Sequence, residues 1–201
     1  MLSFEGSRRA MDTTRASLLM RVKDLNDAEA WNEFVRLYRP ILVRFARARG
    51  LDASEAEDVA QDCLQSITRH IRSFDYRPER GGFKRWLCVL VKNQVRGLLR
   101  KRRERQAETG ELRRPQNREP SPEQVWEKIC LEEHVKYCLE KIRTDVQPKT
   151  YRAFQCSWED HWPVERICQE LGMSRDQVYV AKSRVTRRLR EMMADLLGED
   201  V

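Results

Sequence analysis

Residues 169–184 have the sequence QELGMSRDQVYVAKSR, and this stretch decides the fold of the C-terminal part of the chain. Gly172 separates two runs whose apolar residues recur at helical spacing, and glycine can adopt the left-handed conformation that a tight corner requires. Ser174 and Gln177 have the spacing of a capping box at the start of the second run. The pattern predicts a short helix over 163–171, a three-residue turn and a longer helix over 174–196, which together form a helix-turn-helix.

The second helix of this corner has a polar and largely basic face. Val178, Ala181 and Val185 share its apolar face, so most side chains between them point outward. Arginine can pair with guanine and glutamine with adenine in a major groove, which favours DNA binding. A helical corner with an ordinary solvated face is the alternative. The candidate DNA contacts are Arg175, Asp176, Gln177, Tyr179, Lys182, Ser183, Arg184 and Arg187.

The composition of the 201 residues favours helices over buried strands. Hydrophobic residues make up 40% and charged residues 35%, which suits thin cores built from amphipathic helices. No period-two pattern predicts a strand, so the expected fold class is all-α. The net charge of +7 permits a polyanionic partner without proving one. No apolar run approaches the roughly 20 residues of a membrane span and no signal peptide is recognisable, so we expect a cytoplasmic protein.

Three amphipathic stretches predict the helices of the N-terminal half. The first covers 27–49, and Pro40 within it predicts a kinked or split helix. The second starts at Ser54, which has the spacing of a capping box with Glu57. The third covers 83–105 and ends in a run of arginine and lysine. These helices together predict a small helical domain.

The division into domains follows the composition. Residues 106–120 contain Gly and Pro and almost no large apolar residue, so they predict a flexible linker. Ser121 then caps a new helix that has Pro122 at its first position. We therefore expect two small helical domains joined by a linker. The boundaries are 1–16 for a loose leader, 17–105 for the first domain, 106–120 for the linker and 121–201 for the second domain.

The sequence offers no enzyme motif and no well-defined metal site. It has neither a P-loop nor an HExxH motif, and its three histidines lack a nucleophile and an acid at suitable spacing. Cys130, His134 and Cys138 fall at i, i+4 and i+8 of a predicted helix, so neighbours could share a face. Zinc would need a fourth ligand, and cysteines at helical spacing among aliphatic residues are usually core. We expect no catalysis, no metal and no cofactor.

With both halves described, the chain resembles the extracytoplasmic-function group of bacterial RNA polymerase sigma factors. The resemblance covers about residues 17–197 and rests on three motifs in a fixed order. They are AEDVAQDCLQSI, GGFKRWLCVLVKNQVRGLLRKRRER and ICQELGMSRDQVYVAKSRVTRRLRE, with the linker between the second and the third. The resemblance implies two folded parts, sigma regions 2 and 4, and a dissociable subunit that directs core polymerase to promoters.

The resemblance also implies protein partners. Asp58, Gln61 and Asp62 would contact the clamp helices of the polymerase β′ subunit, and the C-terminal domain would contact the β flap. An acidic patch in a basic protein agrees with a protein partner, although compensation of the helix dipole is an alternative explanation. An anti-sigma factor is a further implied partner, which nothing in the sequence identifies.

Two DNA contacts follow from the resemblance in the same way. The helix-turn-helix residues given above would contact the duplex minus-35 element. The loop at 75–82 and the helix after it would capture the melted minus-10 element, which needs stacking groups and basic phosphate contacts. A solvated basic helix end is the alternative explanation of the run at 96–105. The implied minus-10 contacts are Tyr76, Arg77, Arg80, Lys84, Arg85, Lys92, Asn93, Arg96 and Arg100.

Two other functions compete with the sigma factor. An autonomous helix-turn-helix regulator would bind duplex DNA as a dimer, with the N-terminal half serving dimerisation or sensing. An enzyme with a helix-turn-helix tail, such as a serine recombinase, would need an α/β catalytic domain. The missing strand pattern argues against the enzyme.

Overall fold

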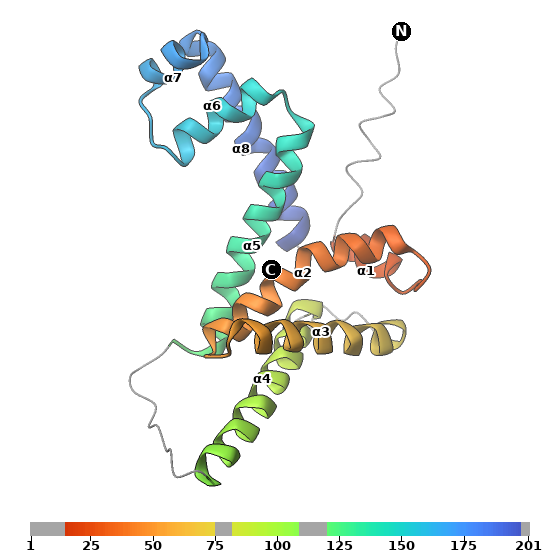
Figure 1. The fold of residues 1–201 in the computed structure, drawn as a ribbon. Helices are drawn as coiled ribbons and strands as arrows, with labels where there is room; N and C mark the ends of the chain where they lie inside the picture. Colours follow the sequence, from red (N-terminus) through yellow and green to blue (C-terminus); the bar gives the residue numbers. More distant parts are fainter. Residues whose placement is uncertain (1–14, 75–81, 109–119, 198–201) are drawn as a thin grey trace. The chain divides into compact units, whose positions relative to one another are not determined.

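The computed structural model describes residues 15–74, 82–108 and 120–197, and these residues form helices and no strand. The prediction of an all-α fold is therefore confirmed for the described part of the chain. None of its helices is long and apolar enough to span a lipid bilayer. The elements are α1 (Arg15–Arg21), α2 (Ala28–Ala48), α3 (Ala53–His70), the short 3-10 helix η1 (Ile71–Ser73), α4 (Gly82–Glu108), α5 (Pro122–Asp145), α6 (Pro148–Trp158), α7 (Val164–Leu171) and α8 (Arg175–Leu197) (Figure 1).

The described residues divide into two compact units. The N-terminal unit runs up to Glu133, and the C-terminal unit starts at His134, so the boundary falls within α5. The first turns of α5 therefore belong to the same unit as α2, α3 and α4.

The N-terminal unit is built around α2, α3 and α4, which pack on one another. Phe83 of α4 has its ring centroid 5.7 Å from that of Phe34 and 5.3 Å from that of Tyr38, both on α2. Trp86 packs against Phe74 and Phe83, with centroids 5.2 and 5.4 Å away. Aromatic rings in edge-on and tilted contacts therefore fix the start of α4 on α2.

Helix α2 continues through Pro40, so the predicted split does not occur. Proline removes one backbone hydrogen bond of a helix and crowds the preceding turn. The apolar side chains on either side of it are buried, and their packing holds the two halves in one helix. These are Leu37, Tyr38, Ile41 and Leu42.

The cap of α3 lies two residues earlier than predicted. The Asp52 side chain accepts a 2.9 Å hydrogen bond from the Glu55 backbone N–H, and the Asp52 N–H donates to the Glu55 carboxylate at 3.0 Å. The predicted box of Ser54 and Glu57 is wrong. Asp52–Glu55 and Ser54–Glu57 have the same spacing and comparable cap preference, so local sequence could not separate them.

Two predicted ends also differ from the structure. Helix α4 continues to Glu108, because Gln106, Ala107 and Glu108 are good helix formers, so the first residues of the predicted linker are helical. Helix α1 begins at Arg15, inside the predicted leader of 1–16.

The C-terminal unit contains the helix-turn-helix predicted from the sequence. Helices α6, α7 and α8 pack on one another (Figure 1). Ile167 of α7 and Val178 of α8 are fully buried in one apolar cluster with Cys156 of α6. Gly172 ends α7 with a φ of +55°, the left-handed conformation expected of it. The turn therefore fixes α8 against α6 and α7, with its outer face open.

Candidate nucleic-acid interface

The surface of α3 has an open acidic patch. Asp58, Gln61 and Asp62 are all exposed, while the adjacent Val59 and Cys63 are buried. Neither aspartate has an ion pair with a described residue. Dipole compensation acts mainly in the first turn of a helix, and these residues lie in the second and third turns of α3. The dipole therefore does not explain them, and they are free to contact a partner.

Helix α4 holds most of the predicted minus-10 contacts. Arg85, Asn93, Arg96 and Arg100 are exposed on it. Lys84 and Lys92 are also on α4 but are only 13% and 24% exposed. The remaining three predicted contacts, Tyr76, Arg77 and Arg80, lie outside the described residues.

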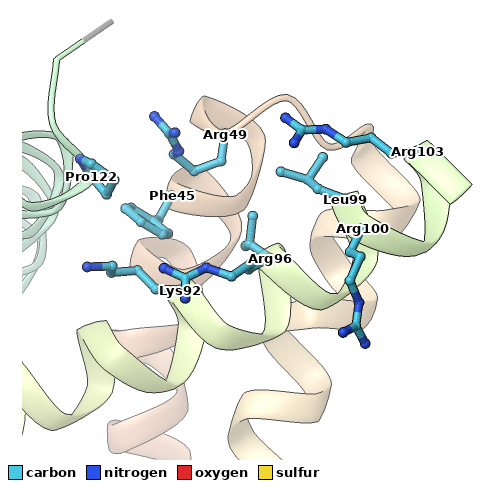
Figure 2. A pocket seen from close by; sticks show the side chains of 9 residues that line it. Phe45, Arg49, Lys92, Arg96, Leu99, Arg100, Arg103 and Pro122 are labelled. Atoms are coloured by element: carbon cyan, nitrogen blue, oxygen red, sulfur yellow. The ribbon is translucent and has the colours of Figure 1, made fainter. Parts of the chain in front are cut away.

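The C-terminal half of α4 borders a hollow with an apolar floor and a basic rim (Figure 2). Its volume is about 370 Å³. The floor is formed by Phe45, Val95, Leu99 and Pro122. The cations around it are Arg49, the residue that caps the end of α2, and four residues of α4, namely Lys92, Arg96, Arg100 and Arg103. Cations beside a low-dielectric wall concentrate positive potential, so this hollow is suited to an anionic ligand such as a phosphate backbone.

The rim cations differ in their partners. Neither Arg96 nor Arg103 has an ion pair with a described residue, and Arg100 lies 3.7 Å from Glu104 of its own helix. The set of implied DNA contacts did not include Arg49 or Arg103. The basic run at 96–105 contains Arg103 and could have pointed to it, but Arg49 is brought here by the packing of α2, for which the sequence has no local signal.

The N-terminal half of α4 is different, because its lysines are already paired. Lys84 Nζ donates to Glu127 Oε2 at 2.5 Å, and Lys92 Nζ is hydrogen-bonded to Glu123 Oε1. The hydrogen bond from Lys92 lowers the pKa of the Glu123 carboxyl below its ordinary value. Two implied DNA contacts are thus held by carboxylates from the first turns of α5.

The outer face of α8 contains the predicted duplex contacts. Arg175, Asp176, Gln177, Tyr179, Ser183, Arg184 and Arg187 are exposed, and Lys182 is half-buried. Arg175 forms a 2.6 Å ion pair with Glu165 of α7. These residues share the outer face with the exposed Val180.

The capping box at the start of α8 is confirmed. The Gln177 side-chain oxygen accepts from the Ser174 N–H at 2.8 Å, and the Gln177 N–H donates to the Ser174 hydroxyl at 3.2 Å. Bidentate pairing with adenine uses both polar atoms of a glutamine amide. In this structure the Gln177 oxygen faces the Ser174 N–H, so the side chain would have to turn before it could pair bidentately with adenine.

The aromatic residues before the corner have mixed positions. Phe154 is buried in the core, whereas Trp158 is 56% exposed and stacks on Phe154 with centroids 5.8 Å apart. The Arg166 guanidinium lies 3.9 Å from the centroid of Trp162. Trp158 is therefore the exposed aromatic residue of this group.

Five of the six cysteines are buried, and Cys168 is partly buried. In the ranges that the structure describes, no three His, Cys, Asp or Glu side chains group to hold a metal ion. Cys130, His134 and Cys138 are each buried in α5. Burial raises the pKa of the Cys138 and Cys63 thiols to about 12, so both stay protonated near neutral pH.

Comparison with known proteins matches much of the N-terminal unit to a family of sigma-factor domains. The model of the family described as Sigma-70 region 2 matches residues 34–105, which include α3 and nearly all of α4. The ECF RNA polymerase sigma factor RpoE of Cereibacter sphaeroides is 28% identical over 116 residues, which are 57% of this chain and 61% of the relative. The match thus covers less than two thirds of the relative's length.

One of the solved structures that match has a low structural similarity to this chain. It is the sigma factor RpoE from Bartonella quintana in complex with the anti-sigma factor NepR, at 21% identity and a TM-score of 0.34, and the match covers 81% of this chain and 95% of that one. From the match over 34–105 and the RpoE relative we conclude that the chain contains a sigma-70 region 2 domain and is a distant homologue of the extracytoplasmic-function RNA polymerase sigma factors.

Proposed function

We propose that the chain is a dissociable RNA polymerase subunit that directs core polymerase to specific promoters and starts transcription there. The match of residues 34–105 to sigma-70 region 2 is the observation that carries this proposal. The matched segment holds both an open acidic patch and a basic helix. In this role the chain acts in the cytoplasm with core polymerase, and the chemistry of RNA synthesis belongs to the polymerase.

Asp58, Gln61 and Asp62 are the proposed contacts with the clamp helices of β′. The two carboxylates lie one helical turn apart, are exposed and have no ion pair among the described residues. Carboxylates that stay open in a chain with a net charge of +7 favour a basic protein surface over DNA. The C-terminal unit would add the contact with the β flap, for which Trp158 is the exposed aromatic candidate.

The basic face of α4 is the proposed site for the melted minus-10 strand. Arg96, Arg100 and Arg103 follow one another along the helix, beside an apolar hollow. Single strands bind where cations follow the backbone and apolar or aromatic groups meet the bases. The outer face of α8 is the proposed contact with the minus-35 duplex, where arginine and lysine can meet base edges and phosphates.

Transcription in a purified system tests the proposal. Core polymerase and this chain are combined on DNA from upstream of the chain's own gene, and discrete run-off products are expected only when both are present. Asp58→Asn/Asp62→Asn should abolish core binding and the products while leaving the fold intact, because both side chains are exposed.

The matched control removes two carboxylates elsewhere. Glu140→Gln/Glu170→Gln changes the net charge equally at two exposed positions and should leave transcription unchanged. Failure of the wild-type chain to associate with core, together with tight dimeric binding to duplex DNA, would contradict the proposal and favour an autonomous regulator.

A further inference from the structure

The first turns of α5 carry an acidic face that is docked on α4. Glu123 and Glu127 lie one turn apart on α5 and bind Lys92 and Lys84 respectively. Both carboxylates remain more than 60% exposed, whereas the two lysines are largely covered. The lysines, not the carboxylates, are therefore the groups that this contact removes from solvent.

An aromatic anchor and a second charge cluster hold this segment, residues 122–133, in place. Trp126 is 2% exposed, and its ring meets Phe45 of α2 edge-on with centroids 5.5 Å apart. One end of the Arg44 guanidinium donates to Glu133 and the other to Glu132, each at 2.6 Å. A buried aromatic ring flanked by ion pairs is the arrangement of a specific docking contact.

The docked contact is incompletely satisfied. The indole nitrogen of Trp126 is buried and has no hydrogen-bond partner among the described residues. A buried donor without an acceptor weakens the state that buries it. Burial of this N–H therefore lowers the stability of the docked state, which makes it easier for the contact to open.

The space at this contact matches what a single strand requires. A hollow of about 600 Å³ lies there, and it is lined on the α4 side by cations and by the exposed Val89, and on the α5 side by Trp126 between two carboxylates. The lysine ammonium groups bind anions here, and the carboxylates of Glu123 and Glu127 occupy the positions where phosphate oxygens would bind. The indole ring lies beside them, as a base does in a strand.

We infer that residues 122–133 are a built-in competitor of single-stranded DNA for the N-terminal half of α4. This inference rests on the proposed function, because Lys84 and Lys92 are among the minus-10 contacts that the resemblance to sigma factors implies. In the free chain Glu123 and Glu127 hold both lysines. Capture of the strand replaces the two carboxylates by phosphates and displaces the segment.

Strand affinity of the full-length chain tests the inference. The probe is a short fluorescein-labelled single-stranded oligonucleotide of mixed sequence, followed by anisotropy. Glu123→Gln/Glu127→Gln should bind it about three- to tenfold tighter than the wild type, since two partly exposed ion pairs no longer compete. The matched variant Glu140→Gln/Glu170→Gln changes the net charge equally and should gain less than about twofold. Equal gains in the two variants would overturn the inference.

A second measurement detects the contact itself. A carbodiimide joins a carboxylate to a neighbouring amine as an amide, so it should link Glu123 to Lys92 and Glu127 to Lys84 in the free chain. Saturation with the oligonucleotide should reduce both links, as counted by mass spectrometry of peptides. Links that persist unchanged with bound strand would also overturn the inference.

Failure of the inference is distinguishable from failure of the proposed function. If the wild type supports promoter-specific initiation but the two double variants bind the strand equally, the inference fails and the function stands. If the wild type never initiates with core, the function fails. A selective gain of Glu123→Gln/Glu127→Gln would then still support the competition.

Discussion

Both halves of α4 carry cationic side chains, but in different surroundings. In the N-terminal half, Lys84 and Lys92 are covered and held by α5 carboxylates. In the C-terminal half, Arg96 and Arg103 are exposed around an apolar hollow and have no ion pair with a described residue. The comparison shows that the cationic surface of this helix is not uniform. In the proposed role, its open end would meet phosphates directly, and its covered end would first exchange the α5 carboxylates for phosphates.

Loss of the Phe45 ring should have the largest effect on stability. The ring lies under the hollow beside the open half of α4 and also packs against Trp126 of α5. Phe45→Ala should destabilise the N-terminal unit by about 3–5 kcal/mol, as for other buried aromatic residues. Urea unfolding followed by circular dichroism measures the change. Val180→Ala, at an exposed site of the C-terminal unit, is the control and should cost less than about 0.5 kcal/mol. A decrease of less than about 1 kcal/mol in the unfolding free energy of Phe45→Ala would show that the ring stabilises neither the hollow nor the contact with α5.

Removal of the open cations should have the next largest effect. Arg96→Ala/Arg100→Ala/Arg103→Ala should weaken single-strand binding at least about tenfold. The slope of log K against log salt concentration should also become shallower by about 2, because each lost phosphate contact accounts for roughly 0.7. Anisotropy titrations at several salt concentrations give both values.

The control for this variant removes three exposed cations from α5. Lys128→Ala/Lys136→Ala/Arg143→Ala changes the net charge equally and should keep most of the salt slope. Equal losses in the two triple variants would mean that net charge, and not the open end of α4, governs binding.

A smaller effect is expected at the N-terminal half of α4, where Lys92 is paired with Glu123. Because the bond from Lys92 stabilises the charged form of Glu123, the folded-state pKa of this carboxyl is below the ordinary 4.5. The contribution of this pair to stability is therefore present above the ordinary pKa and is lost as the pH falls through the lowered one. Lys92→Met should return the pKa of Glu123 towards 4.5, as followed by NMR of the side-chain carboxyl, whereas Arg96→Met should leave it unchanged. The same titration in all three proteins would show that the pair does not form.

The features that the sequence predicted correctly rest on neighbouring residues. The corner at Gly172 and the box of Ser174 and Gln177 depend on positions within a few residues of each other, so spacing alone revealed them. The same kind of spacing was ambiguous at α3, where Asp52 and not Ser54 provides the cap. Local patterns thus fixed the kind of element better than its first residue.

The features that the sequence did not predict depend on distant residues. Lys84 and Glu127 are 43 positions apart, and Lys92 and Glu123 are 31 apart, with the residues from 109 to 119 between α4 and α5. No periodicity relates such positions, so the pairing of the α4 lysines with α5 carboxylates could not be predicted from the sequence. Arg49 likewise reaches the hollow only through the packing of α2.

Detection of melted promoter DNA tests the central claim most directly, namely that this chain opens promoters as a polymerase subunit. Permanganate modifies unpaired thymines, and it is applied to DNA from upstream of the chain's own gene with core polymerase, the chain or both. We expect reactive thymines just upstream of the start site only with both components, and their loss with Arg96→Ala/Arg100→Ala/Arg103→Ala. Protection of fully paired DNA by the chain alone, with no reactive thymine when core is added, would contradict the account.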